Sequence, residues 1–188
     1  PHPFLADVTE NGIENPIDIM EGEPYESPMK PFGGIESFAW APDSKSIVYV
    51  SRKKEGMEYS LSTNSDLYLY NLETKTTTNL TEGMMGYDTN PVFSPKGDKL
   101  AWLSMEHDGY ESDMNRIFVM DMKTGEKTDL TENWDYTVST IAWNPNGKKI
   151  YFIAPYHGPS PIFSVEVGSK KIETIAAQMC DYASLAPV

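Results

Sequence analysis

The sequence predicts an all-β fold assembled from repeated four-stranded units, and three observations support this prediction. An internal repeat of about 50 residues recurs three times along the chain. Segments between its landmarks are continuously apolar or alternate apolar and polar residues, as β-strands do. Turn-forming residues are frequent, with 13 glycines and 14 prolines among 188 residues. Because such units repeated around an axis form a β-propeller, we predict a partial β-propeller of about three four-stranded antiparallel blades with flanking strands.

The first strand of each unit ends at an aromatic residue. Trp40, Phe93 and Trp143 lie 53 and 50 residues apart. A proline follows each of them two positions later, within a short turn such as residues 94–98. Proline presets the backbone angle φ in such turns, and glycine accepts a positive φ. We therefore expect a tight connection from the first strand to the second in every unit.

The second strand of each unit is a short apolar run that a long polar segment follows. Residues 47–50 and 100–103 form such runs, and residues 51–65 and 105–115 follow them. β-branched and aromatic residues dominate the runs, as expected for strands in a packed sheet. The polar segments are predicted to be loops, and we expect no helix in any unit.

The third and fourth strands close each unit. Residues 67–72 alternate strictly between two faces, and a turn such as residues 123–126 leads to the fourth strand. Residues 171–180 admit a second interpretation, because their apolar side chains also fit helical spacing. The repeat aligns this segment with the fourth strands of the other units, so we predict a strand.

The repeat divides the chain into parts of one truncated propeller domain. Residues 1–34 are predicted to be the end of a preceding blade and a lead-in, and residues 181–188 the start of the next blade. The three blades between them are assigned to residues 35–83, 84–135 and 136–180. Propellers typically have 4 to 8 blades, so we expect the chain to come from a longer protein. Self-association through the exposed faces of the terminal blades is also expected.

Composition and charge exclude several classes of protein. With 15 basic and 28 acidic residues, the net charge is −13, which disfavours binding to nucleic acid or to an anionic membrane surface. The longest apolar run, residues 150–156, is too short to span a bilayer. The single cysteine, Cys180, cannot form an intramolecular disulfide and is expected to be a buried small hydrophobe.

No motif for catalysis or cofactor binding is present. The sequence lacks a phosphate-binding glycine loop and a His-Glu-x-x-His zinc motif. It also lacks Gly-x-Ser-x-Gly, the turn that exposes a nucleophilic serine. The three histidines, His2, His107 and His157, lie in predicted loops or at the terminus, where solvated side chains are expected. We therefore predict no catalytic residue, cofactor or metal site in this chain.

The repeat cores at residues 40–47, 93–100 and 143–150 resemble the WD40-like repeats of TolB-type propellers. Residues 100–135 resemble the propeller of bacterial prolyl oligopeptidase family serine peptidases, in the branch of dipeptidyl and acylaminoacyl peptidases. The resemblance implies a role in proteolysis: a propeller placed before a C-terminal α/β-hydrolase domain that carries a Ser-Asp-His triad. It further implies a periplasmic or secreted location.

On this resemblance, the chain is a non-catalytic segment that gates and positions short peptides for a hydrolase domain outside it. Relatives in one branch hold the free amine of the substrate with an acidic pair in Asp-Trp-x-Tyr-Glu-Glu, and residues 133–136 lack the two glutamates. The acidic loop at residues 106–113 is the expected substitute, with Glu111 and Asp113 as candidate substrate-binding residues. The alternatives are a merely solvated loop and, for the whole chain, a TolB-like or WD-like scaffold for protein–protein interaction without a hydrolase.

Overall fold

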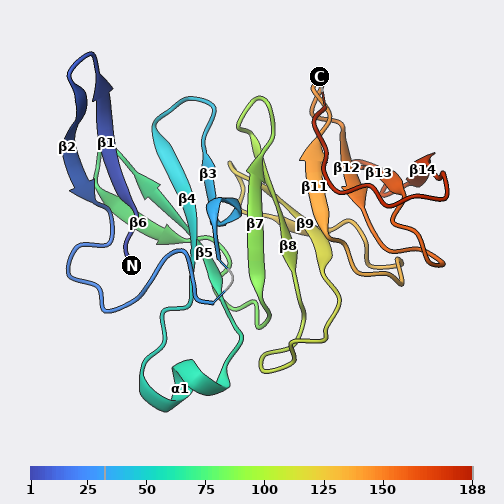
Figure 1. Ribbon diagram of the computed structural model, residues 1–188, viewed down its shortest axis with the longest axis horizontal. Helices are drawn as coiled ribbons and strands as arrows, with labels where there is room; N and C mark the ends of the chain where they lie inside the picture. Colours follow the sequence, from blue (N-terminus) through green and yellow to red (C-terminus); the bar gives the residue numbers. More distant parts are fainter. Residues whose placement is uncertain (32, 188) are drawn as a thin grey trace.

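The computed structural model describes residues 1–31 and 33–187 and confirms the predicted all-β partial propeller. Three four-stranded antiparallel sheets and one two-stranded hairpin follow one another like blades of a fan (Figure 1). The hairpin at the N-terminus consists of β1 (Phe4–Thr9) and β2 (Gly12–Asp18). A single 3-10 turn, Ile35–Ser37, leads into the first four-stranded sheet.

Each four-stranded sheet is a simple meander, in which consecutive strands pair with one another. The first sheet contains β3 (Phe38–Trp40), β4 (Ser46–Ser51), β5 (Asp66–Asn71) and β6 (Thr76–Asn79). The second contains β7 (Asp88–Phe93), β8 (Lys99–Ser104), β9 (Arg116–Asp121) and β10 (Lys127–Asp129). The third contains β11 (Thr140–Trp143), β12 (Lys149–Ile153), β13 (Ile162–Glu166) and β14 (Ile172–Ala176).

The sheets meet along their first strands. Strand β7 contacts both β3 and β11, whereas β6 and β14 are the outer edges of their sheets. The indole Nε1 of Trp143 on β11 donates a hydrogen bond to the carbonyl oxygen of Val92 on β7 at 2.9 Å. One landmark of the sequence repeat therefore joins two neighbouring sheets near the centre of the fan.

The central residues of the second strands are apolar because these strands lie between neighbouring blades. On β8, Leu100 and Trp102 pack into the core between the first and second sheets. Ala101 and Leu103 point the other way, into the core between the second and third sheets. Successive strand residues face opposite sides, so the central part of a strand between two blades needs apolar residues at consecutive positions. Such burial contributes about 1.5–3 kcal/mol for each large apolar side chain.

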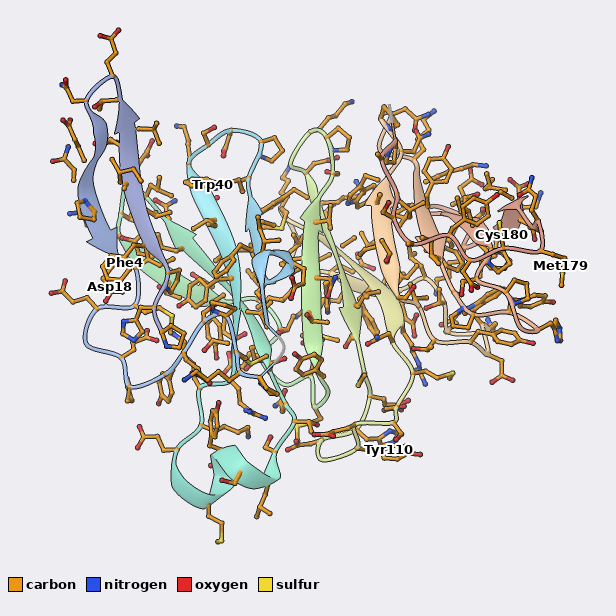
Figure 2. All side chains as sticks on the ribbon, viewed as in Figure 1. Phe4, Asp18, Trp40, Tyr110, Met179 and Cys180 are labelled. Carbon is orange, nitrogen blue, oxygen red and sulfur yellow. The ribbon has the colours of Figure 1, made fainter. Side chains whose placement is uncertain are left out.

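Two predictions about local structure are wrong and one is confirmed. The long segment after β4 contains one short helix, α1 (Gly56–Leu61), whose first turn is supported by the Lys54–Glu58 ion pair at 2.8 Å. Cys180 is exposed rather than buried, and Figure 2 shows it beside Met179 at one edge of the molecule. Residues 172–176 form β14, as the repeat predicts. The division into blades at residues 35, 84, 136 and 181 stays a prediction.

Candidate binding site

The two ends of the sheets differ, and one end carries the candidate site. Five-residue turns such as 94–98 join the first strands to the second strands at one end. Loops 52–65 and 105–115 join the second strands to the third strands at the opposite end. In Figure 1 both loops hang from the same side of the fan, with α1 in the first of them. Tyr110 of the second loop marks this end in Figure 2. We call it the long-loop end.

A cavity of about 390 Å³ lies at the long-loop end, where residues of the first two sheets meet. Its walls come from the lead-in segment, from both long loops and from the segment before β7. The lining residues are Met29, Lys30, Pro31, Arg52, Thr63, Tyr87, Met105 and Glu111. A more open hollow of about 780 Å³ shares Lys30, Pro31 and Arg52 with it. Ligand pockets in proteins commonly occupy about 300–1,000 Å³, so the smaller cavity is large enough for a small molecule.

Arg52 is a fixed cation in the wall between the two hollows. Its Nη1 donates a hydrogen bond to the carbonyl oxygen of Ser62 at 2.6 Å, and its guanidinium lies 4.2 Å from the centre of the Tyr59 ring. Stacking on an aromatic ring and a backbone hydrogen bond both restrict the rotamers of the side chain. The arginine is therefore held in place before any ligand arrives.

Tyr87 adds a neutral hydroxyl to the cavity. Burial raises the pKa of Tyr87 above its ordinary value of 10, and the nearby charge of Arg52 offsets this only in part. The phenol is thus protonated at neutral pH and available as a hydrogen-bond donor.

A carboxylate clasp joins the two long loops. Asp108 Oδ1 accepts hydrogen bonds from Ser62 Oγ at 2.7 Å, from Thr63 N at 2.8 Å and from Asn64 N at 3.1 Å. Burial alone would raise the pKa of Asp108, but these hydrogen bonds outweigh it and hold the pKa below its ordinary value. The carboxylate is ionised at neutral pH. It fixes the turn at Ser62, whose carbonyl oxygen accepts the hydrogen bond from Arg52.

The two predicted substrate-binding residues have different surroundings. Asp113 Oδ2 accepts hydrogen bonds from the backbone N–H groups of Glu106 and His107 and contacts His107 Nδ1, each at 2.9 Å. Burial raises its pKa, and these contacts more than reverse the effect, so the carboxylate is ionised and shapes its own loop. Glu111 is exposed on the cavity wall and forms no hydrogen bond or ion pair with the described residues. Their role in binding substrate stays a prediction.

The histidines lie in three separate environments. His2 pairs with Asp18 at 2.8 Å, His107 pairs with Asp113, and His157 lies 3.5 Å from the Tyr136 hydroxyl. Within residues 1–31 and 33–187, no group of three His, Cys, Asp or Glu side chains could hold a metal ion. Over the same residues, no helix is long and apolar enough to cross a membrane.

The chain is similar to known proteins. Residues 34–186 match the family model of the TolB β-propeller domain. Dipeptidyl-peptidase 5 of Porphyromonas gingivalis is 53% identical over 183 residues, which is 97% of this chain and 27% of that protein. The chain therefore spans about a quarter of the length of this relative. The match agrees with the resemblance of residues 100–135 to the propellers of dipeptidyl and acylaminoacyl peptidases.

Two solved structures have a similar fold. TolB from Acinetobacter baumannii matches with a TM-score of 0.60 and 22% identity, over 95% of this chain and 38% of that one. A puromycin-hydrolyzing peptidase of Mycobacterium tuberculosis matches with a TM-score of 0.60 and 15% identity, over 96% of this chain and 25% of that one. At these identities, the likeness supports the propeller fold alone.

Proposed function

The chain belongs to the TolB β-propeller domain family, and from this premise we propose that it is the non-catalytic propeller segment of a dipeptidyl peptidase. It would gate access and position short peptides for a serine-type hydrolase domain elsewhere in a longer chain. The observation that carries this proposal is the 53% identity to a dipeptidyl peptidase over 97% of the chain. A propeller acts on such chemistry by orienting the substrate and by excluding larger molecules.

The long-loop end supplies the groups for this positioning. The first residue of a peptide carries an ammonium group, and an uncommitted carboxylate at a cavity is a suitable partner for it. Glu111 is such a carboxylate. Asp113 contributes indirectly, because its hydrogen bonds to Glu106 and His107 fix the loop that presents Glu111. We therefore assign amine binding to Glu111, and loop support to Asp113.

The proposal includes a location and a tendency to associate. A periplasmic or secreted location is part of the proposal, and the match of residues 34–186 to the TolB β-propeller domain supports it. Two apolar side chains are exposed in the N-terminal part of the chain: Phe4 on the hairpin (62% exposed) and Trp40 at the end of β3 (52% exposed) (Figure 2). Trp40 has the same place in the repeat as Trp143, which packs on the preceding sheet. In the isolated chain, we expect such faces to support self-association, which size-exclusion chromatography would detect as a concentration-dependent increase in size.

A scaffold without a hydrolase is the second candidate. The match of residues 34–186 to the family model of the TolB β-propeller domain motivates it. In that case the long-loop end would bind another protein instead of a peptide terminus.

Labelling with a serine-directed fluorophosphonate distinguishes the two candidates. The probe reacts with activated serines, and the labelled peptide can be identified in the full-length gene product by mass spectrometry. The peptidase proposal predicts a labelled serine outside residues 1–188 and none within them. Label inside residues 1–188, or no label anywhere in the folded full-length protein, would overturn the proposal, and the second result would favour a scaffold.

A further inference from the structure

The cavity contains an arginine whose charge is not neutralised by the protein. The chain has two arginines. Arg116 is paired with Glu106 and, at 3.6 Å, with Asp129. For Arg52, no carboxylate of the described residues lies within 4.0 Å. In a chain with 28 acidic side chains and a net charge of −13, an unpaired and half-buried arginine is unexpected, because buried charges are normally paired.

The hydrogen bonds of Arg52 are also mostly unused. A guanidinium has five N–H donors, and the described residues accept one hydrogen bond from Arg52, at Ser62. Its Nε is enclosed by protein without an acceptor, so only the Nη groups can meet a ligand in the cavity. A ligand that supplies acceptor oxygens and a negative charge would be favoured at the Nη hydrogens that the protein leaves unused.

The other polar groups of the cavity complete a set that suits a zwitterion. Lys30 and the neutral phenol of Tyr87 are further donors, and Glu111 is the one carboxylate among the lining residues. The carboxylate group of a zwitterion could therefore pair with Arg52, and its ammonium group with Glu111. The cavity volume of 390 Å³ equals that of a cube about 7 Å wide, which is the span of about two extended residues.

We propose that this cavity binds short zwitterionic peptides of dipeptide size, with Arg52 holding the C-terminal carboxylate and Glu111 the ammonium group. The ligand is the kind of molecule that a dipeptidyl peptidase releases, so the cavity is a retention site for product. This inference rests on the proposed function for its biological meaning. The role of Arg52 in binding a carboxylate rests on the geometry alone.

Isothermal titration calorimetry with the 188-residue chain tests the inference without any substitution. The probes are Ala-Ala, Ala-Ala amide, which lacks the carboxylate, and acetyl-Ala-Ala, which lacks the ammonium group. We expect Ala-Ala to bind, and each blocked peptide to bind at least about tenfold more weakly, because a charge-assisted hydrogen bond is lost in each case.

A pair of variants assigns the carboxylate to its partner. Arg52→Met should weaken the binding of Ala-Ala at least about tenfold and leave the binding of Ala-Ala amide unchanged. Lys148→Met is the control, since it removes an exposed cation from the turn before β12, outside the cavity, and it should not change either affinity. Circular dichroism of each variant establishes that the sheets are retained.

The outcomes separate this inference from the proposed function. Equal binding of Ala-Ala and its amide, or no binding of Ala-Ala, overturns the carboxylate site, and the fluorophosphonate result would still stand. Equal binding of Ala-Ala and acetyl-Ala-Ala overturns the assignment of Glu111 and leaves the Arg52 site intact. If Arg52→Met binds both Ala-Ala and Ala-Ala amide more weakly, and to the same extent, the effect is structural and the role of Arg52 in binding the carboxylate is overturned.

Discussion

The carboxylate of Asp108 accepts a hydrogen bond from the hydroxyl of Ser62 at 2.7 Å, between residues 46 positions apart in the long loops of two different sheets. The same oxygen also accepts the backbone N–H groups of Thr63 and Asn64. The carbonyl oxygen of Ser62 accepts a hydrogen bond from Arg52. The Asp108–Ser62 contact therefore links the seam between two blades to the wall of the cavity.

Replacing Asp108 should weaken the seam. Asp108→Ala removes the acceptor of three hydrogen bonds, and we expect a loss of about 1–2 kcal/mol in the free energy of unfolding. At roughly 2–4 °C per kcal/mol for a chain of this size, the melting temperature should fall by several degrees. Differential scanning calorimetry measures this. Asp135→Ala, at an exposed aspartate without a hydrogen bond in the described chain, is the control. Equal melting temperatures for both variants would contradict the clasp.

The turn of the first sheet should be improved by a glycine. Ser44 has a φ of 59°, whereas Gly97 and Gly147, at the same place in the other two sheets, have φ values of 72° and 71°. A side chain in this left-handed region costs about 1 kcal/mol, so Ser44→Gly should stabilise the chain by up to about that amount. Urea unfolding measures the change. Gly97→Ala should destabilise more than Gly147→Ala, because its added Cβ would lie 3.2 Å from Pro42. A destabilising Ser44→Gly would refute this reading of the turn.

Gly86 should tolerate no side chain. A Cβ at this position would overlap the backbone carbonyl oxygen of Met105, just after β8, which cannot rotate away as a side chain could. We therefore expect Gly86→Ala to lose more than about 3 kcal/mol of stability, beyond the usual range for single substitutions. Gly168→Ala is the matched control, as nothing lies within 4 Å of its added Cβ. Thermal unfolding of the two variants should differ widely, and similar curves would contradict the close approach.

Asp88 should make stability depend on pH. Its Oδ1 accepts the indole N–H of Trp102 at 3.0 Å, and burial raises the pKa of Asp88 to about 7. Between its ordinary value of 3.8 and about 7, the folded chain binds more protons than the unfolded chain. The contribution of Asp88 to stability therefore falls as pH rises through this window, and the loss is complete above it.

Asp88→Asn keeps an acceptor for Trp102 and removes this titration. Relative to the unsubstituted chain, its stability in urea should increase from about pH 4 to pH 7 and then remain level. Asp108→Asn is the contrast, because the pKa of Asp108 is lowered in the folded chain. The contribution of Asp108 to the stability of the unsubstituted chain is therefore lost only as pH drops below about 4. The stability difference between Asp108→Asn and the unsubstituted chain should thus change only in acid. A stability difference for Asp88→Asn that does not vary with pH would refute the raised pKa.

Much of the fold could be predicted from the sequence because repeat and alternation are both local signals. The spacing of Trp40, Phe93 and Trp143 sets the repeat, and the two-sided burial of β8 explains its continuous apolar run. Helix α1 could not be predicted, since it is six residues long and buries none of them. The prediction for Cys180 is wrong for a related reason: a thiol is usually buried, but Cys180 follows the last strand and is exposed.

The candidate site was predictable only in part. The acidic loop pointed to Glu111 and Asp113, and the structure places only Glu111 on the cavity wall. Arg52 lies 59 positions before Glu111 in the sequence, and no local motif connects the two. Whether an arginine is paired, or an aspartate is saturated by backbone N–H groups as Asp113 is, depends on contacts between loops that the sequence does not display.

The most direct test of the central claim is the steady-state cleavage of a chromogenic dipeptide substrate by the full-length protein with Glu111→Gln. If Glu111 holds the substrate amine for a catalytic domain elsewhere, KM should rise about tenfold with little change in kcat, because a ground-state contact is lost. The 188-residue chain alone should show no turnover. An unchanged KM, or turnover by the isolated chain that a serine-directed inhibitor abolishes, would contradict the account.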